Sequence, residues 1–200
     1  MKLTTIHENS PRGVFFKAAL DDLKEYGIDK LSPHRIEAKT GVKDLYDDSE
    51  QLLTDLIVLG FDELTSRLEK LYIMYPSFEQ RLYHMCEVYL ELAFTHSNLI
   101  NIMFNYKQQF HSLPPAHVKE AGDQTFEGIK RIMSAAIMQD LLKSKDSQKA
   151  ALASWSYLHG SAMQIQRHTK ESKASVETIK GIYGKLYSLL SKGLVSNSSH

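Results

Sequence analysis

Apolar residues recur every three to four positions along almost the whole chain, which places them on one face of an α-helix. Runs of alternating β-branched residues bounded by turns, which indicate strands, are missing from the sequence. The pattern therefore predicts an all-α protein of about nine helices.

The first fifty residues contain helix starts and stops in close succession. Ser-Pro pairs followed by glycine stops predict helices over residues 11–26 and 33–40, and a second short helix is expected over Val42–Tyr46. A long helix follows from Ser49 until Tyr75-Pro76. Two short helices joined through a glycine, with one helix before and a long helix after them, have the order of a helix-turn-helix head.

The rest of the chain predicts a larger helical body. Its helices are expected over residues 78–95, 99–104, 118–142, 148–168 and 176–190, with a loop at 107–115. On the last two helices, apolar residues at steps of three and four form packing seams. We expect two domains, residues 1–48 and residues 49–195.

Composition narrows the class of protein. Hydrophobic residues make up 42% of the chain and charged residues 24%, which is typical of a globular protein with a buried core. Lys plus Arg equals Asp plus Glu at 24 each, so any nucleic-acid contact must come from a local patch. The N-terminus lacks an apolar signal region and no apolar stretch approaches the roughly 20 residues that cross a bilayer, so we expect a cytoplasmic protein.

Ordered motifs in the first domain resemble the N-terminal domain of TetR/AcrR-type regulators. They are Ala18-Ala19-Leu20, Glu25-Tyr26-Gly27-Ile28, Ile36, Thr40-Gly41-Val42, Leu45-Tyr46 and Glu50-Gln51-Leu52-Leu53. The order of the set is specific, although each residue alone is common. The resemblance implies DNA binding by the head, for which the candidate contacts are Arg12, Lys17, Lys30, Arg35, Lys39, Lys43 and, as a phosphate donor, Tyr46.

A second resemblance covers the C-terminal part, so that the similarity spans about residues 10–190. Tyr89, Ala93, His96 and Leu99-Ile100-Asn101-Ile102-Met103-Phe104 are similar to the middle of one TetR C-terminal domain type, and Trp155-Ser156-Tyr157-Leu158-His159-Gly160 looks like its Trp…His-Gly signature. The resemblance implies a homodimer, with the last two helices of each copy forming a four-helix interface, and an apolar ligand pocket among the middle helices.

These implications assign residues to two further sites. Pocket candidates are the Met and aromatic residues of the body, although such side chains are ordinary core more often than a ligand cage. They are Met85, Tyr89, Phe94, Met103, Phe104, Phe126, Met133, Trp155 and His159. Candidates for the dimer interface are the seam residues Ala151, Leu158, Ala162, Ile165, Ile179, Tyr183, Leu186 and Leu190.

The sequence departs from the family in the recognition region. Only Lys43 and Asp44 separate Val42 from Leu45, where family members usually have about five residues, commonly with a Ser and a Thr that contact phosphate. From Gly41 to Glu50, one lysine stands against four acidic residues, a formal charge of −3. Because DNA affinity depends on Lys and Arg neutralising phosphates, an acidic recognition element repels DNA.

Three functional hypotheses follow from these residues. The first is a TetR-like transcriptional regulator that binds DNA as a homodimer and responds to a small apolar ligand. The second is a TetR-fold ligand sensor or protein-interaction module that has lost operator binding. The third, a metal-dependent helical oxidase, would use His84, Glu87 and Glu91, but matching Glu-x-x-His pairs on other helices are missing. We expect neither enzymatic activity nor a metal or cofactor.

Overall fold

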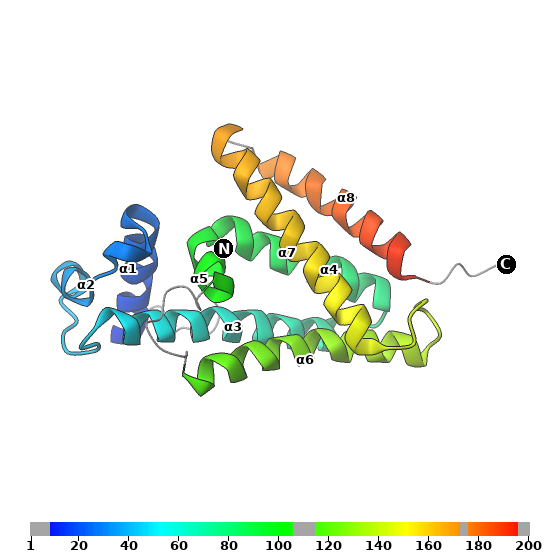
Figure 1. The fold of residues 1–200 in the computed structure, drawn as a ribbon, viewed down its shortest axis with the longest axis horizontal. Coiled ribbons are helices and arrows are strands. Elements are labelled where there is room, and N and C mark those ends of the chain that lie inside the picture. The colour runs from blue at the N-terminus through cyan, green and yellow to red at the C-terminus, as the bar shows by residue number, and fades with distance from the viewer. Residues whose placement is uncertain (1–8, 106–114, 173–175, 196–200) are drawn as a thin grey trace. The chain divides into compact units, whose positions relative to one another are not determined.

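The structure is a computed structural model that describes residues 9–105, 115–172 and 176–195 (Figure 1). The described residues form eight α-helices and one 3-10 turn, and the predicted all-α fold is confirmed. The elements are α1 (Pro11–Tyr26), η1 (Ile28–Lys30), α2 (Pro33–Thr40), α3 (Ser49–Met74), α4 (Phe78–Thr95), α5 (Ser97–Asn105), α6 (Ala116–Met138), α7 (Ser147–Ser172) and α8 (Val176–Leu194).

Side-chain caps explain where several helices begin. The Oγ of Ser10 accepts a hydrogen bond from the backbone N–H of Gly13, and the Oγ of Ser32 does the same for Arg35. These caps satisfy N–H groups that have no partner inside the helix. At the start of α3 the capping group is the carboxylate of Asp48, which accepts from the N–H of Gln51 at 2.7 Å.

The predicted short helix over Val42–Tyr46 is wrong. These residues lie in a loop between α2 and α3. Gly41 ends α2 with a left-handed backbone (φ 73°), and Asp44 also has a positive φ of 59°. A single helical turn costs more to nucleate than its few hydrogen bonds return, so five residues between a glycine stop and the cap of the next helix do not form one.

The prediction that one helix extends to Leu142 is also wrong, since α6 ends at Met138. Asp140 adopts a left-handed conformation (φ 59°) just beyond the helix. The N–H of Leu141 donates to the carbonyl of Ala136 and that of Asp140 to Ile137, which is the paired arrangement of a Schellman motif. The carbonyls of the last turn are therefore satisfied before the expected end.

The chain divides into two compact units. Unit 1 comprises residues 1–63 and 95–123, and unit 2 comprises residues 64–94 and 124–200. The long helices α3 and α6 contribute to both units, so the predicted boundary between residues 48 and 49 coincides with the start of α3 and stays a prediction.

The core of unit 1 lies where α1, α2, the first part of α3 and α5 meet. Phe15, Ile36 and Leu56 are among its fully buried side chains. Gly60 of α3 allows α5 to approach closely, because a Cβ at this position would lie 2.3 Å from the sulfur of Met103. A larger residue at this position would have to displace the Met103 side chain.

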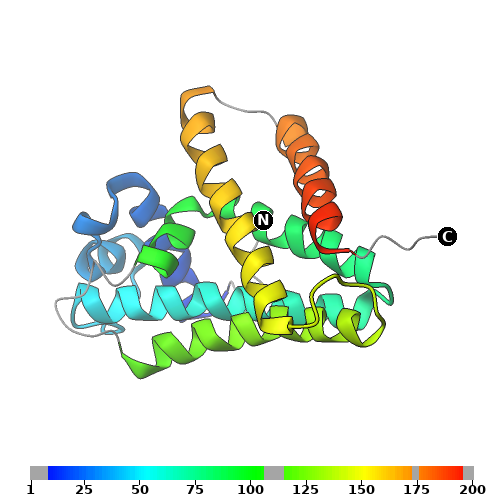
Figure 2. The ribbon, with the colours of Figure 1, turned by 45° about the vertical axis from the view of Figure 1, so that its right-hand side comes forward.

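In unit 2 the last two helices pack side by side as an antiparallel pair (Figures 1 and 2). Aromatic contacts join α8 to α4: Tyr183 stacks on Phe94 at 6.4 Å between ring centroids, and Tyr187 meets Tyr83 edge to face at 5.3 Å. No helix in the described ranges is long and apolar enough to cross a membrane.

Candidate functional site

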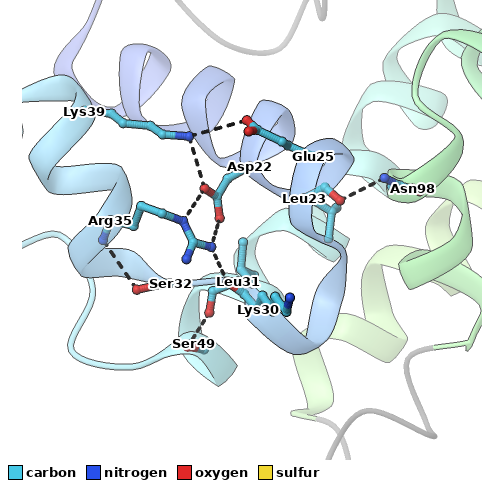
Figure 3. Close-up of polar contacts among 10 residues, drawn as sticks. All are labelled: Asp22, Leu23, Glu25, Lys30, Leu31, Ser32, Arg35, Lys39, Ser49 and Asn98. Carbon is cyan, nitrogen blue, oxygen red and sulfur yellow. Dashed lines mark hydrogen bonds and ion pairs between the residues drawn. The ribbon is translucent and has the colours of Figure 1, made fainter.

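The buried carboxylate of Asp22 fixes α2 against α1 (Figure 3). Arg35 donates to it from Nε at 2.7 Å and from Nη2 at 2.6 Å, and Lys39 donates from Nζ at 3.3 Å. Burial by itself raises the pKa of Asp22, but the hydrogen bonds and charges of Arg35 and Lys39 outweigh it, so the pKa lies below its ordinary value. The group is a permanent anion at neutral pH.

Two of the predicted DNA contacts are therefore engaged within the head. The guanidinium of Arg35 also lies over the ring of Tyr26, at 4.5 Å from its centroid, and donates to the carbonyl of Lys30. Nζ of Lys39 lies 3.9 Å from the carboxylate of Glu25. A phosphate would have to compete with these partners for the two cations.

Tyr46 anchors the end of the α2–α3 loop in the core. Its side chain is 7% exposed, and its ring lies 5.3 Å from that of Phe15 between centroids. The hydroxyl donates to Asp55 at 2.8 Å, and the same carboxylate oxygen accepts from Arg12 at 2.9 Å. Burial and Asp55 raise the pKa of Tyr46, so the hydroxyl keeps its proton and its place inside the protein.

The loop itself is held by side chains rather than by helical hydrogen bonds. The hydroxyl of Thr40 donates to the carbonyl of Ile36 and accepts from the N–H of Val42 at 3.2 Å. The N–H of Asp44 donates to a carboxylate oxygen of Glu37 at 2.9 Å. The loop is therefore a defined structure that replaces the expected recognition helix.

Charge on this surface is mainly negative. Of the predicted cations, Lys17, Lys30 and Lys43 are exposed, and their side chains make no hydrogen bond or ion pair in the part of the chain that the structure describes. The exposed acidic residues Asp44, Asp47 and Glu50 share the region with Lys43. An open hollow of about 330 Å³ next to the loop is lined by Asp48, Glu50, Gln51, Thr54, Asp55, Pro115 and His117.

Asn98 connects α5 to the end of α1. It was not among the site residues that the sequence predicted. Its side-chain amide donates to the carbonyl of Leu23 at 2.9 Å (Figure 3). The N–H of Gly27 donates to the same carbonyl at 3.1 Å. Asp22 and Asn98 carry little sequence signal beyond being polar residues on otherwise apolar helix faces, because their partners lie on other helices.

Three of the pocket candidates meet in unit 2. The hydroxyl of Tyr89 lies 2.6 Å from Nδ1 of His159 in a hydrogen bond. The rings of Tyr89 and Trp155 meet at 5.1 Å between centroids, and Trp155 stacks on His159 one turn later in α7 at 6.4 Å. We call Tyr89, Trp155 and His159 the aromatic cluster. Met85 is buried one turn before Tyr89 in α4.

Burial shifts the protonation equilibria of the aromatic cluster. It raises the pKa of the Tyr89 hydroxyl and lowers the pKa of His159. Both side chains are therefore neutral at pH 7, and a neutral histidine offers one ring nitrogen as an acceptor for the tyrosine hydroxyl. The cluster presents apolar rings together with one polar pair.

The other pocket candidates lie elsewhere. Met103 and Phe104 belong to unit 1, where Phe104 meets Phe61 edge to face at 5.6 Å. Phe94 is half-buried against Tyr183, whereas Phe126 is half-buried and Met133 is fully buried in α6. The predicted set is thus divided between the units, and its role as one pocket stays a prediction.

The dimer candidates point largely into their own chain. Ala151, Leu158, Ala162, Tyr183 and Leu190 are buried, and Ile165 and Leu186 are half-buried. Ile179 belongs to α8, but its side chain lies outside the described residues. The large apolar residues that these helices expose are instead Leu152, at 55%, and Leu189, at 61%.

Two of the three metal-ligand candidates bind each other, and the third lies near an arginine. His84 binds Glu87 at 2.8 Å and stacks on Tyr75 at 3.9 Å, while Glu91 lies 3.9 Å from Arg67. Among the described residues, no group of three His, Cys, Asp or Glu side chains could hold a metal ion.

Known proteins show where this architecture occurs. Residues 82–178 match the family described as "Tetracyclin repressor-like, C-terminal domain". No match is found among curated protein sequences. Among solved structures, a protein with unknown function from Rhodococcus sp. RHA1 has a TM-score of 0.78 at 23% identity, over 96% of this chain and 100% of that chain.

Two similar structures are named regulators. The ketosteroid transcriptional regulator KstR2 of Mycobacterium tuberculosis has a TM-score of 0.71 at 15% identity, over 94% of this chain and 97% of its own. The fatty acid degradation regulator FadR of Bacillus halodurans has a TM-score of 0.75 at 13% identity, over 92% and 99%. These likenesses show the fold.

Residues 82–178 therefore form a tetracyclin repressor-like C-terminal domain, and the chain shares the fold of solved transcriptional regulators. The predicted family resemblance is confirmed.

Proposed function

We propose that the protein is a homodimeric transcriptional regulator whose body binds a small apolar ligand and whose head contacts DNA. The observation that carries this proposal is the match of residues 82–178 to a TetR-type C-terminal domain, on a chain with the fold of TetR-family regulators. A ketosteroid regulator and a fatty acid degradation regulator share the fold, and ketosteroids and fatty acids are both apolar molecules.

The aromatic cluster supports an apolar ligand with one polar group. Its rings provide apolar contact area, and the pair of Tyr89 and His159 provides hydrogen-bonding groups in a largely buried place. Ligand sites commonly combine these two features. The cluster would therefore contact the hydroxyl, keto or carboxyl end of such a molecule.

Trp155 makes ligand binding directly measurable, because it is the only tryptophan of the chain. Titration with fatty acids of increasing chain length, and separately with a ketosteroid, is expected to change its fluorescence and to raise the unfolding temperature. A ligand at a hundredfold excess over Kd adds about 2.7 kcal/mol of stability. Unchanged fluorescence and unfolding temperature with both ligand classes would contradict the apolar-ligand proposal.

Exposed apolar residues on α7 and α8 support the homodimer. Leu152 and Leu189 each leave more than half of a large apolar side chain accessible. A second copy placed against these helices would remove that surface from water, which contributes roughly 25 cal/mol per Å². Light scattering on the purified protein should give twice the mass of one chain, and a monomer at micromolar concentration would contradict the homodimer.

DNA binding can be tested with the promoter region of the gene that encodes this protein. Fluorescence anisotropy at low salt should show tighter binding to this DNA than to random DNA of equal length. Because no recognition helix forms over residues 42–46, the contact would come from α1, the segment before α2, α2 and the loop, with Lys17, Lys30 and Lys43 as exposed cations whose side chains make no ion pair within the described residues. Equal binding to both DNAs would exclude operator recognition.

The second candidate is a ligand-responsive protein of the same fold that acts through protein contacts and has lost operator binding. The specific observation that favours it is the loop of residues 41–48, which replaces the recognition helix and carries exposed acidic residues. This second candidate function predicts the same response to an apolar ligand and the same homodimer, but no sequence-specific DNA binding. The anisotropy measurement therefore separates the two candidates.

A further inference from the structure

The ring of Tyr72, at the end of α3, lies beside two guanidinium groups. Arg81 of α4 lies over the ring at 4.4 Å from its centroid, and Arg131 of α6 at 5.5 Å. The next two residues in the chain are also accessible: Ile73 is 83% exposed and Met74 is 65% exposed. We call Tyr72, Ile73, Met74, Arg81 and Arg131 the Tyr72 patch, all of which belongs to unit 2.

Neither arginine forms an ion pair in the described part of the chain. Arg81 donates from Nε to the carbonyl of Tyr75 at 2.7 Å, which fixes the stem of the side chain and leaves its Nη groups without a carboxylate. Arg131 is exposed and lies over the Tyr72 ring. Stacking on an aromatic ring orients a guanidinium and lowers the cost of removing water from it.

The composition of the patch is that of a protein interface. Tyr, Met and Arg are enriched at interfaces, and Tyr and Arg are enriched among the residues that carry most of the binding energy. Isolated exposed apolar residues are ordinary, but Ile73 and Met74 are consecutive and directly follow Tyr72, whose ring carries the two guanidinium groups. Met138, at the end of the helix that carries Arg131, is also 82% exposed.

Charge complementarity selects the partner. We propose that the Tyr72 patch is a docking surface for a protein partner that presents a carboxylate side chain next to apolar side chains. The carboxylate would bind the guanidinium groups of Arg81 and Arg131, and the apolar side chains would cover Ile73 and Met74.

A polyanion fits the patch less well. DNA binding relies on many Lys and Arg residues along a surface, whereas this patch has two cations and its helices also expose Glu69 and Glu79. An anionic membrane surface likewise attracts a run of basic residues. A partner protein with one or two carboxylates and apolar side chains would complement the charge of the two arginines and cover the exposed Ile73 and Met74.

The proposal is tested on the full chain with a displayed library of random peptides. Selected peptides should be enriched in Asp or Glu next to Leu, Ile, Met or Phe. A labelled synthetic copy of a selected peptide should bind at least tenfold more weakly to the R81Q/R131Q variant, the effect expected for an interface residue worth about 1.4 kcal/mol. The matched control K24Q/K70Q removes two exposed lysines and should change affinity less than twofold.

Variant folding is controlled separately. R81Q removes the hydrogen bond to the Tyr75 carbonyl, so the exposed R131Q variant is measured alone, and circular dichroism is recorded for each variant. R131Q alone should weaken peptide binding while the helical signal stays unchanged.

Several results would overturn the proposal. They are a failure to select any peptide, selected peptides without carboxylates, and equal binding by wild type and R131Q. Binding of phosphatidylglycerol vesicles or of random duplex DNA that is lost in R131Q would also overturn it, because the patch would then serve a membrane or a nucleic acid.

Discussion

Arg35 donates two hydrogen bonds to the fully buried carboxylate of Asp22, at 2.7 and 2.6 Å, and so connects α2 to α1. Replacing Asp22 by Asn keeps the shape but leaves two cations without their anion. Removing one partner of a buried ion pair typically lowers the free energy of unfolding by about 3–5 kcal/mol. Because Arg35 and Lys39 are partly exposed, we expect a loss of about 2–3 kcal/mol here.

Urea unfolding monitored by circular dichroism measures this loss. The control is Asp21→Asn, which neutralises the adjacent, exposed carboxylate and should change stability by less than about 0.5 kcal/mol. Equal stability of the two variants would contradict a structural role for the Asp22 pair.

The same pair predicts a dependence of stability on pH. The folded-state pKa of Asp22 lies below the ordinary value of 3.8, so its contribution is fully present above 3.8 and is lost as pH falls through the folded pKa. The stability difference between wild type and Asp22→Asn should therefore narrow as pH is lowered from neutrality to below 3.8. A difference that stays constant over this range would exclude the linkage.

Tyr89→Phe tests the polar pair of the aromatic cluster. The change removes the hydroxyl that binds His159 at 2.6 Å and should cost about 1 kcal/mol, the usual value of one such hydrogen bond. Tyr83→Phe on the same helix is the control, because the Tyr83 hydroxyl makes no hydrogen bond in the described structure. Thermal unfolding compares the two variants, and equal losses would argue against the pair.

Leu152→Glu and Leu189→Glu test the dimer. Each places a carboxylate on an apolar surface that we propose to be covered by the second copy, so the double variant should be a folded monomer by light scattering. Ile73→Glu introduces the same charge at an exposed residue of α3 and should leave the mass unchanged. A dimer that survives the double change would place the interface elsewhere.

Salt dependence tests the DNA contact. Replacing both Lys17 and Lys43 by Gln removes two candidate phosphate contacts from each copy, or four in the proposed dimer, so the slope of log affinity against log salt should fall by about 3.6. The control replaces Lys70 and Lys149 of the body by Gln and should keep the slope. A head variant with the wild-type slope would show that neither lysine contacts phosphate.

Most helix positions could be predicted from the sequence because their signals are local. Ser10 and Ser32 begin α1 and α2 through caps within three residues, and Gly27 and Gly41 end them. The sequence showed that residues 42–46 are fewer than the family pattern requires, but it did not show that so short a segment forms a loop instead of a short helix.

The candidate sites were less predictable because they depend on distant partners. Asp22 and Arg35 are 13 residues apart on different helices, and Tyr89 and His159 are 70 apart. Helical spacing identified the seams of α7 and α8, but not whether a seam faces its own chain or a second copy. Ala151 is buried and the adjacent Leu152 is exposed, a difference that only the folded chain reveals.

The loop of residues 41–48 has a consequence for protein engineering. Its two ends are held by Thr40 and Tyr46, while Lys43 and Asp44 between them are exposed. Insertions are tolerated best at such exposed tips between anchored ends. A helix grafted after Lys43 should therefore leave the rest of the chain folded, which makes this loop a place where a new binding element can be added.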